Sequence, residues 1–90
     1  MQTNLQAEVW SQSNCPACTE AKNLLKSKGY EVFSKEIGIN TGYTKKDLID
    51  KVPNARTIPQ IFVGNEYIGG LLELKRYLLK NDNNKTTKVV

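Results

Sequence analysis

The sequence has no histidine, only two cysteines and no long apolar run. Without histidine the protein lacks the most frequent general base and the most frequent metal ligand, so Ser-His and Cys-His nucleophilic sites are excluded. No apolar segment approaches the roughly 18 residues that a membrane-spanning helix requires. The first residues carry neither the basic start nor the apolar core of a secretion signal. We therefore expect a soluble, cytoplasmic protein that makes no contact with membranes.

Blocks of like charge are also missing. The 13 Lys and Arg residues outnumber the 9 Asp and Glu residues and give a net charge of +4, but the cations are spread along the chain. They do not interleave with aromatic residues, and proteins that follow a phosphate backbone usually cluster their cations on one surface. The charge pattern therefore argues against nucleic acid as a partner.

The remaining composition is that of one small globular domain. The chain has 90 residues, of which 39% are hydrophobic and 24% are charged, and domains average about 100–150 residues. Residues 81–88 lack apolar periodicity, so we do not expect them to contribute to a core. The sequence predicts a folded domain over residues 1–80 and a flexible tail over residues 81–90.

Hydropathy patterning predicts seven elements in the order β-α-β-α-β-β-α. Alternating apolar and polar residues indicate a strand at 5–10, and a second strand is expected at 31–37. The β-branched and aromatic residues at 58–63 indicate a third strand, which a two-residue turn joins to a fourth at 66–68. Apolar residues at helical spacing indicate helices at 15–28, 44–52 and 71–80. The first two strands should be parallel, because a helix connects them, and the last two should form a hairpin. Four aromatic residues are expected in the core: Trp10, Phe33, Phe62 and Tyr77.

Three helix ends carry local signals. Pro16 suits the first helical position, where its missing N–H would have no partner in any case. Gly29 is expected to cap the end of the same helix. Thr44 followed by Asp47 resembles a capping box at the start of the second helix.

Cys15-Pro16-Ala17-Cys18 is the one reactive constellation in the sequence. At the start of a helix the Cys15 sulfur faces unpaired backbone N–H groups and the positive end of the helix dipole, which favour a thiolate. Cys18 lies one turn further along the same side, close enough to attack a mixed disulfide formed on Cys15. The residues therefore predict Cys15 as the nucleophile and Cys18 as the resolving thiol.

Other interpretations of the two cysteines stay open. Both could be inert core residues, because free cysteine is among the most buried residue types. A structural zinc site needs four ligands, which two cysteines and no histidine cannot supply in a monomer without carboxylates. Two chains could also each donate a thiolate to a shared metal or iron-sulfur cluster.

A second motif lies at residues 56–62, Arg-Thr-Ile-Pro-Gln-Ile-Phe, and places Pro59 at the start of a predicted strand. With the two cysteines upstream and Gly69-Gly70 downstream, the chain resembles the glutaredoxins over roughly residues 5–80, and in its brevity the small members from bacteria and phages. The resemblance implies an α/β, thioredoxin-like fold, in which a four-stranded mixed sheet of order 2-1-3-4 is flanked by three helices. It also implies a monomer that uses glutathione as reductant and holds no metal.

The resemblance further implies a site for glutathione and substrate. Pro59 takes the place of a cis proline beside the dithiol, and the backbone of Ile58 takes the place that pairs with substrate. Thr57 and Arg56 match positions near the cysteinyl and glycyl parts of glutathione, and the glycine pair matches a turn near the γ-glutamyl part. The expected site comprises the catalytic residues Cys15 and Cys18 and the binding residues Gln12, Pro16, Ala17, Arg56, Thr57, Ile58, Pro59, Gly69 and Gly70.

The activity implied is that of a dithiol glutaredoxin, which reduces protein disulfides and glutathione mixed disulfides, with ribonucleotide reductase as one candidate partner. Three positions depart from the family pattern: Ala17 stands for an aromatic residue, Gln12 for a lysine, and Leu72 for an acid. These departures motivate a second hypothesis, a thioredoxin-like electron donor that a flavoprotein thioredoxin reductase reduces. A third is a dimer that holds a [2Fe-2S] cluster through Cys15 thiolates and two glutathiones.

Overall fold

The computed structural model describes the backbone of residues 6–38 and 40–86 and the side chains of residues 6–38 and 40–80. The element order is the one predicted, β-α-β-α-β-β-α. The elements are β1 (Gln6–Ser11), α1 (Pro16–Ser27), β2 (Glu31–Glu36), α2 (Lys45–Lys51), β3 (Gln60–Val63), β4 (Glu66–Gly69) and α3 (Leu71–Thr86). None of the helices within this part of the chain is both long and apolar enough to cross a membrane.

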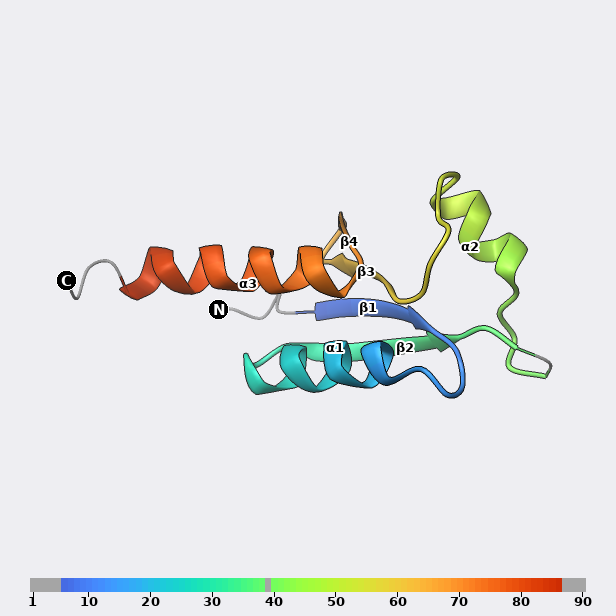
Figure 1. Cartoon of the computed structure of the whole chain (residues 1–90), viewed down its shortest axis with the longest axis horizontal. Coiled ribbons are helices and arrows are strands. Elements are labelled where there is room, and N and C mark those ends of the chain that lie inside the picture. The colour runs from blue at the N-terminus through green and yellow to red at the C-terminus, as the bar shows by residue number, and fades with distance from the viewer. Residues whose placement is uncertain (1–5, 39, 87–90) are drawn as a thin grey trace.

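The four strands form one mixed sheet in the order β2-β1-β3-β4. β1 runs parallel to β2 and antiparallel to β3, and β3 and β4 form an antiparallel hairpin. Figure 1 shows α1 running along β2, while α2 stands beyond the end of the sheet where the arrows of β1 and β2 point. The sheet order and the three helices confirm the predicted thioredoxin-like fold.

The alternation of side chains along the strands gives the sheet two apolar faces. The first face buries Ala7 and Val9 of β1 and Ile61 of β3 against α1 and α3. The second face buries Trp10 of β1 and Phe62 of β3 against α2. Since neighbours in a strand point to opposite faces, Val9 and Trp10 serve different clusters.

Phe33 corrects the expected set of core aromatics. Trp10 and Phe62 are buried as expected, and Tyr77 is half-buried against the first cluster, but the Phe33 side chain is 46% exposed. Phe33 lies on the edge strand β2, opposite Glu8, and therefore on the second face. α2 has seven residues and packs over Trp10 and Phe62, so it does not extend to Phe33.

Several predicted boundaries move by a few residues. β1 includes Ser11, and Leu5 lies outside the described residues. β3 begins at Gln60 rather than at Ile58, because Pro59 has no N–H to offer a neighbouring strand. α3 continues to Thr86, six residues past its predicted end, because no glycine or proline stops the helix there. Residues 87–90 of the predicted tail lie outside the described residues.

The helix ends that bound the site follow their local sequence. After α1, the Gly29 N–H donates to the Lys26 carbonyl and the Tyr30 N–H to the Leu25 carbonyl, both at 3.0 Å. This Schellman arrangement requires the positive φ of +90° at Gly29, while the cap residue itself is Lys28. At α2, Thr44 and Asp47 form the predicted capping box.

Candidate active site

Cys15 is the N-cap of α1, with Pro16 in the first helical turn as predicted. Cys15 is joined to Cys18 by a disulfide, with Cα atoms 5.2 Å apart. The Cys15 Sγ accepts a hydrogen bond from the Cys18 N–H at 3.1 Å. Cys18 is 1% exposed, whereas Cys15 is half-buried at the surface. An incoming group therefore reaches the Cys15 sulfur before that of Cys18.

This geometry assigns different chemistry to the two sulfurs. A backbone N–H aimed at the Cys15 sulfur, together with the helix dipole, stabilises negative charge on that atom once the disulfide is reduced. Cys18 packs inside α1 and lies within bonding distance of Cys15, so it can close the disulfide without a change of backbone. The pair can therefore perform thiol-disulfide exchange.

The sheet brings the second motif to the same end of the molecule as the dithiol. Trp10, near the end of β1, pairs with Gln60 at the start of β3. The loop that follows β1 leads to Cys15, and the residue that precedes β3 is Pro59. The Ile58–Pro59 peptide bond is cis, as the resemblance implied. Segments more than forty residues apart in sequence therefore meet at one edge of the sheet.

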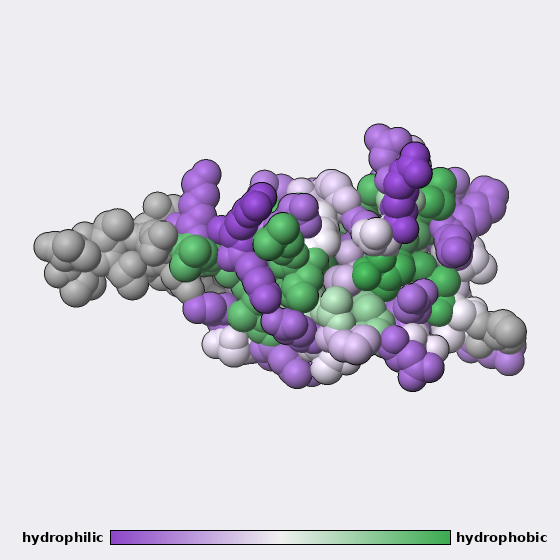
Figure 2. All heavy atoms as spheres, in the orientation of Figure 1, coloured by the Kyte–Doolittle hydropathy of each residue, from purple (hydrophilic) through white to green (hydrophobic). Residues whose placement is uncertain are grey.

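Two hollows flank the segment before the cis proline. The α2 hollow, of about 620 Å³, lies between this segment and α2 and is lined by Gln12, Lys45, Leu48, Ile49, Ala55, Arg56, Thr57 and Ile58. The β4 hollow, of about 360 Å³, lies on its other side and is lined by Asn54, Arg56, Thr57, Gln60, Tyr67, Ile68, Gly69, Gly70 and Glu73. Figure 2 shows hydrophobic surface gathered where α2 meets the rest of the molecule, with hydrophilic side chains around it.

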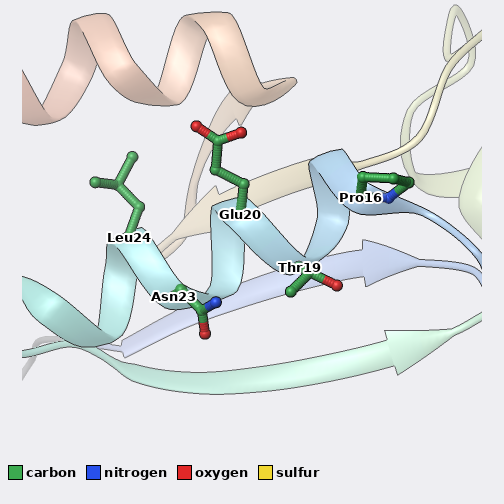
Figure 3. Close-up of a pocket in the computed structure, with 5 residues that line it drawn as sticks. All are labelled: Pro16, Thr19, Glu20, Asn23 and Leu24. Atoms are coloured by element: carbon green, nitrogen blue, oxygen red, sulfur yellow. The ribbon is translucent and has the colours of Figure 1, made fainter.

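The hollows bring together most of the expected binding residues, but not all. Arg56 and Thr57 line both hollows, whereas Gln12 lines only the α2 hollow and the glycine pair only the β4 hollow. Pro16 belongs to a separate hollow along α1, with Thr19, Glu20, Asn23 and Leu24 (Figure 3). Ala17 is half-buried in the first turn of α1.

The glycine pair permits a close approach of chain segments. Gly69 has a φ of +119°, and a Cβ there would meet the Glu73 Cγ at 3.0 Å. A Cβ on Gly70 would lie 3.5 Å from the Pro59 carbonyl oxygen. The Glu73 side chain folds back over the pair and accepts a hydrogen bond from the Gly70 N–H at 3.0 Å. The Gly70 N–H, directly before α3, is therefore already hydrogen-bonded within the protein, to Glu73.

Sequence analysis did not identify Gln60 and Tyr67 as site residues. Gln60 is 4% exposed, donates to Thr57 and accepts from the Tyr67 hydroxyl. Partial burial, and then the charge of Glu73, raise the pKa of Tyr67, so its hydroxyl stays protonated as a donor at neutral pH. The sequence did contain one sign of a role for Gln60, because it is a polar residue at the start of the otherwise apolar strand Gln-Ile-Phe-Val.

Within the described part of the chain, no group of three or more His, Cys, Asp and Glu side chains is placed to hold a metal ion. The chemistry that the site offers by itself is that of two cysteines at the start of α1.

Comparisons with known proteins agree with this geometry. The family model described as Glutaredoxin matches residues 7–68, more than half of the chain. Glutaredoxin 3 of Escherichia coli (strain K12) is 37% identical over 67 residues, which cover 74% of this chain and 78% of that protein. Glutaredoxin 1 of Rickettsia conorii is 36% identical over 62 residues, covering 69% of this chain and 61% of that protein.

Solved structures give the same result. The structure of reduced Escherichia coli glutaredoxin has a TM-score of 0.73 and 31% sequence identity, over 87% of this chain and 98% of that one. Glutaredoxin 1 from Francisella tularensis, complexed with cacodylate, has a TM-score of 0.71 and 25% identity, over 87% of this chain and 96% of that one. With its paired cysteines, cis proline and sheet order, the chain belongs to the glutaredoxin family.

Proposed function

We propose that this protein is a glutathione-dependent dithiol oxidoreductase, which reduces protein disulfides and glutathione mixed disulfides in the cytoplasm as a monomer. The observation that carries the proposal is the Cys15–Cys18 pair at the start of α1, with one sulfur at the surface and the other buried. A site with one accessible and one enclosed thiol suits ordered exchange, because the substrate can reach only the first sulfur.

The reaction balances as two successive exchanges. The Cys15 thiolate attacks one sulfur of the substrate disulfide, forms a mixed disulfide and releases the first substrate thiol. The Cys18 thiol loses its proton and attacks the Cys15 sulfur, which closes the protein disulfide and releases the second thiol. The substrate gains two electrons and the protein dithiol loses two.

Glutathione restores the dithiol by the reverse sequence. Two molecules of glutathione supply two electrons to the protein disulfide and leave as glutathione disulfide. The two hollows beside Thr57 support this step, because they offer backbone groups, the Arg56 cation and the Gly69-Gly70 turn to a short peptide. No metal is required. Disulfides of enzymes such as ribonucleotide reductase are the class of protein substrate we propose.

A second electron source is favoured by the departures from the family pattern. Leu72 is 56% exposed where related proteins commonly carry an acid, and Gln12 stands in the α2 hollow where they carry a lysine. Both changes remove charged contacts to the tripeptide. A flavoprotein thioredoxin reductase would need neither contact, because it delivers electrons directly to the disulfide.

Serine variants of the two cysteines test the proposal. Cys15→Ser should abolish all disulfide reduction, because exchange proceeds through a mixed disulfide, which a serine hydroxyl cannot form. Cys18→Ser should abolish reduction that needs both thiols, while removal of glutathione from a mixed disulfide continues through Cys15 alone. The measurement is NADPH consumption with a small glutathione mixed disulfide, coupled to glutathione and glutathione reductase. Activity that survives in the Cys15 variant would refute the assignment.

The same assay distinguishes the two electron sources. Turnover with glutathione and glutathione reductase, and none with a thioredoxin reductase, would establish glutathione as the reductant. The opposite result would favour the thioredoxin-like donor.

A further inference from the structure

α1 and α3 lie side by side over the first face of the sheet. Leu25 of α1 and Leu74 of α3 belong to one buried cluster beneath them. On their outward side, the Lys75 Nζ of α3 lies 3.0 Å from the Glu20 carboxylate of α1, and Figure 3 shows the Glu20 side chain pointing toward α3. The two helices therefore present one continuous surface to solvent.

This outward surface carries exposed apolar groups. The hollow along α1, of about 620 Å³, extends from the exposed Pro16 to the half-buried Leu24. On α3, Leu72 and Leu79 are 56% and 62% exposed, and their spacing places them on the same side of the helix as Lys75. Figure 2 shows hydrophobic atoms over α1 and over the first turns of α3, with hydrophilic side chains around them. We call the hollow along α1 and this stripe of α3 the α1–α3 surface.

The positive charge of the molecule is concentrated on these two helices. Elsewhere among the described side chains, five cations face six acids, so the charges nearly cancel. In α1, its C-cap residue and α3 up to residue 80, the cations outnumber the acids: Lys22, Lys26, Lys28, Lys75, Arg76 and Lys80 against Glu20 and Glu73. Both acids already have donors, because Glu20 pairs with Lys75 and Glu73 accepts from the Gly70 N–H. The α1–α3 surface is therefore apolar and lies in a positive field, which attracts acidic groups.

The α1–α3 surface begins next to the reactive cysteine. Pro16, which lines one end of the hollow, directly follows Cys15 in the chain. Because a helix rises 1.5 Å per residue, the hollow extends for about 12 Å from Pro16 to Leu24. About four residues of extended chain cover that length. A chain that holds a disulfide at Cys15 can therefore lay the residues beside its own cysteine along this surface.

We propose that the α1–α3 surface docks the protein whose disulfide Cys15 reduces, and that this partner is acidic, with an apolar side chain near its reactive cysteine and carboxylates around it. This inference rests on the proposed function and adds the kind of partner to it. An apolar centre with a charged surround is the usual arrangement of a protein interface. Nucleic acid and lipid headgroups would also be attracted to the positive charge, but neither brings a disulfide to Cys15.

The test compares two symmetrical peptide disulfides in single-turnover oxidation of the reduced protein. The acidic peptide is acetyl-Cys-Gly-Leu-Asp-Asp-Asp-Asp amide, and the neutral peptide has Asn in place of each Asp. Each second-order rate constant is divided by that of free dithiothreitol with the same disulfide, which cancels the difference in their intrinsic reactivity. At low ionic strength we expect the acidic-to-neutral ratio to be about five in the unaltered protein.

Charge reversals show where the acidic peptide lies. Lys22 and Lys26 of α1 are each three residues beyond a residue that lines the hollow, Thr19 and Asn23, so they lie beside it. Lys22→Glu and Lys26→Glu should each lower the ratio about three- to fivefold. Lys46→Glu on α2, where the lysine side chain is 81% exposed, makes the same change in net charge and should alter the ratio by less than about 1.5-fold.

Leu72→Asn tests the apolar contact. It should slow the acidic peptide about threefold, because the leucine of the peptide then loses an apolar neighbour. It should not slow a version of the acidic peptide that has Ser in place of Leu. Equal rates for the acidic peptide in Leu72→Asn and the unaltered protein would overturn the apolar contact.

Two results would overturn the inference as a whole. One is an acidic-to-neutral ratio near one in the unaltered protein. The other is an equal fall of the ratio in Lys46→Glu and in the two α1 variants, which would show that only net charge matters. If one α1 variant does not fold, the other decides. If the unaltered protein reduces neither peptide disulfide, the proposed function itself fails.

Discussion

Glu8 lies on the second face of the sheet, where three groups from β1, β2 and α2 converge on its carboxylate. The Lys51 Nζ of α2 lies 2.9 Å from one oxygen, the Lys35 Nζ of β2 lies 3.4 Å from the other, and the Trp10 indole N–H donates to the first. Burial raises the pKa of Glu8, but the hydrogen bonds from Lys51 and Trp10 and the two lysine charges outweigh it, and the pKa lies below its ordinary value.

Glu8→Gln should therefore destabilise the protein in a pH-dependent way. A carboxyl with a lowered pKa in the folded state adds stability above its ordinary pKa of about 4.3, and this stability is lost as the pH falls through the lowered value. We expect a loss of about 1–2 kcal/mol at pH 7 that shrinks toward zero below about pH 4. Urea unfolding of both proteins at several pH values measures the difference.

Glu20→Gln is the control for this effect. Glu20 also pairs with a lysine, Lys75 at 3.0 Å, but both side chains are about half exposed. Water screens such a pair, so its loss should change the free energy of unfolding by less than about 0.5 kcal/mol. Equal losses in both variants, or a loss in Glu8→Gln that does not depend on pH, would contradict the role given to Glu8.

At the scale of elements, α2 is the helix with the fewest residues and forms one wall of the α2 hollow. Its start depends on the capping box, in which the Asp47 N–H donates to the Thr44 Oγ1 at 3.1 Å and the Thr44 N–H to the Asp47 Oδ2 at 2.9 Å. A helix this short has little stability of its own. The cap and the burial of Leu48 and Val52 therefore hold it in place.

Thr44→Ala should lower the stability of the protein by about 1 kcal/mol. For a domain of this size that loss corresponds to a fall in Tm of about 4–8 °C, which thermal unfolding followed by circular dichroism measures. Thr19→Ala makes the same change inside α1, where alanine has the higher helix propensity, and should be neutral or slightly stabilising. A Thr44→Ala protein as stable as the Thr19→Ala protein would show that the cap contributes nothing.

The boundaries of the elements differ in how well local sequence predicts them. The start of α1 and its end are set by Pro16 and Gly29, two residues whose backbone preferences act within one turn. The end of α3 has no such signal, and polarity alone wrongly suggested that the helix stops at Lys80. The first strand residue of β3 was also missed: the strand begins at Gln60, because Pro59 has no N–H with which to pair.

At the scale of the whole molecule, the net charge of +4 should affect the rate at which charged disulfides arrive. Glutathione disulfide is an anion, so its reaction with the reduced protein should slow by about two- to threefold between low and physiological salt, as the Debye length shortens to about 8 Å. Stopped-flow measurement of the single-turnover rate at several salt concentrations tests this. Bis(2-hydroxyethyl) disulfide is neutral and should react at a constant rate, so an equal slowing of both would refute the electrostatic cause.

The sequence by itself determined the order of the elements and the pairing of the two cysteines at the start of a helix. Both depend on spacing within a few residues, through helix periodicity, strand alternation and the conformations of proline and glycine. The resemblance carried by the cysteine, proline and glycine motifs was enough to predict the sheet order and the cis bond at Pro59.

Only the tertiary structure decided which side chains meet across the sheet. Glu8 and Lys51 are 43 residues apart in the chain, and Phe33 is exposed because α2 covers a different part of its face. The contact of Gln60 with Thr57 is local, but the hydroxyl that orients its amide comes from Tyr67 on the neighbouring strand. Hydrogen bonds and packing of this kind depend on three-dimensional distance, which short-range sequence patterns do not encode.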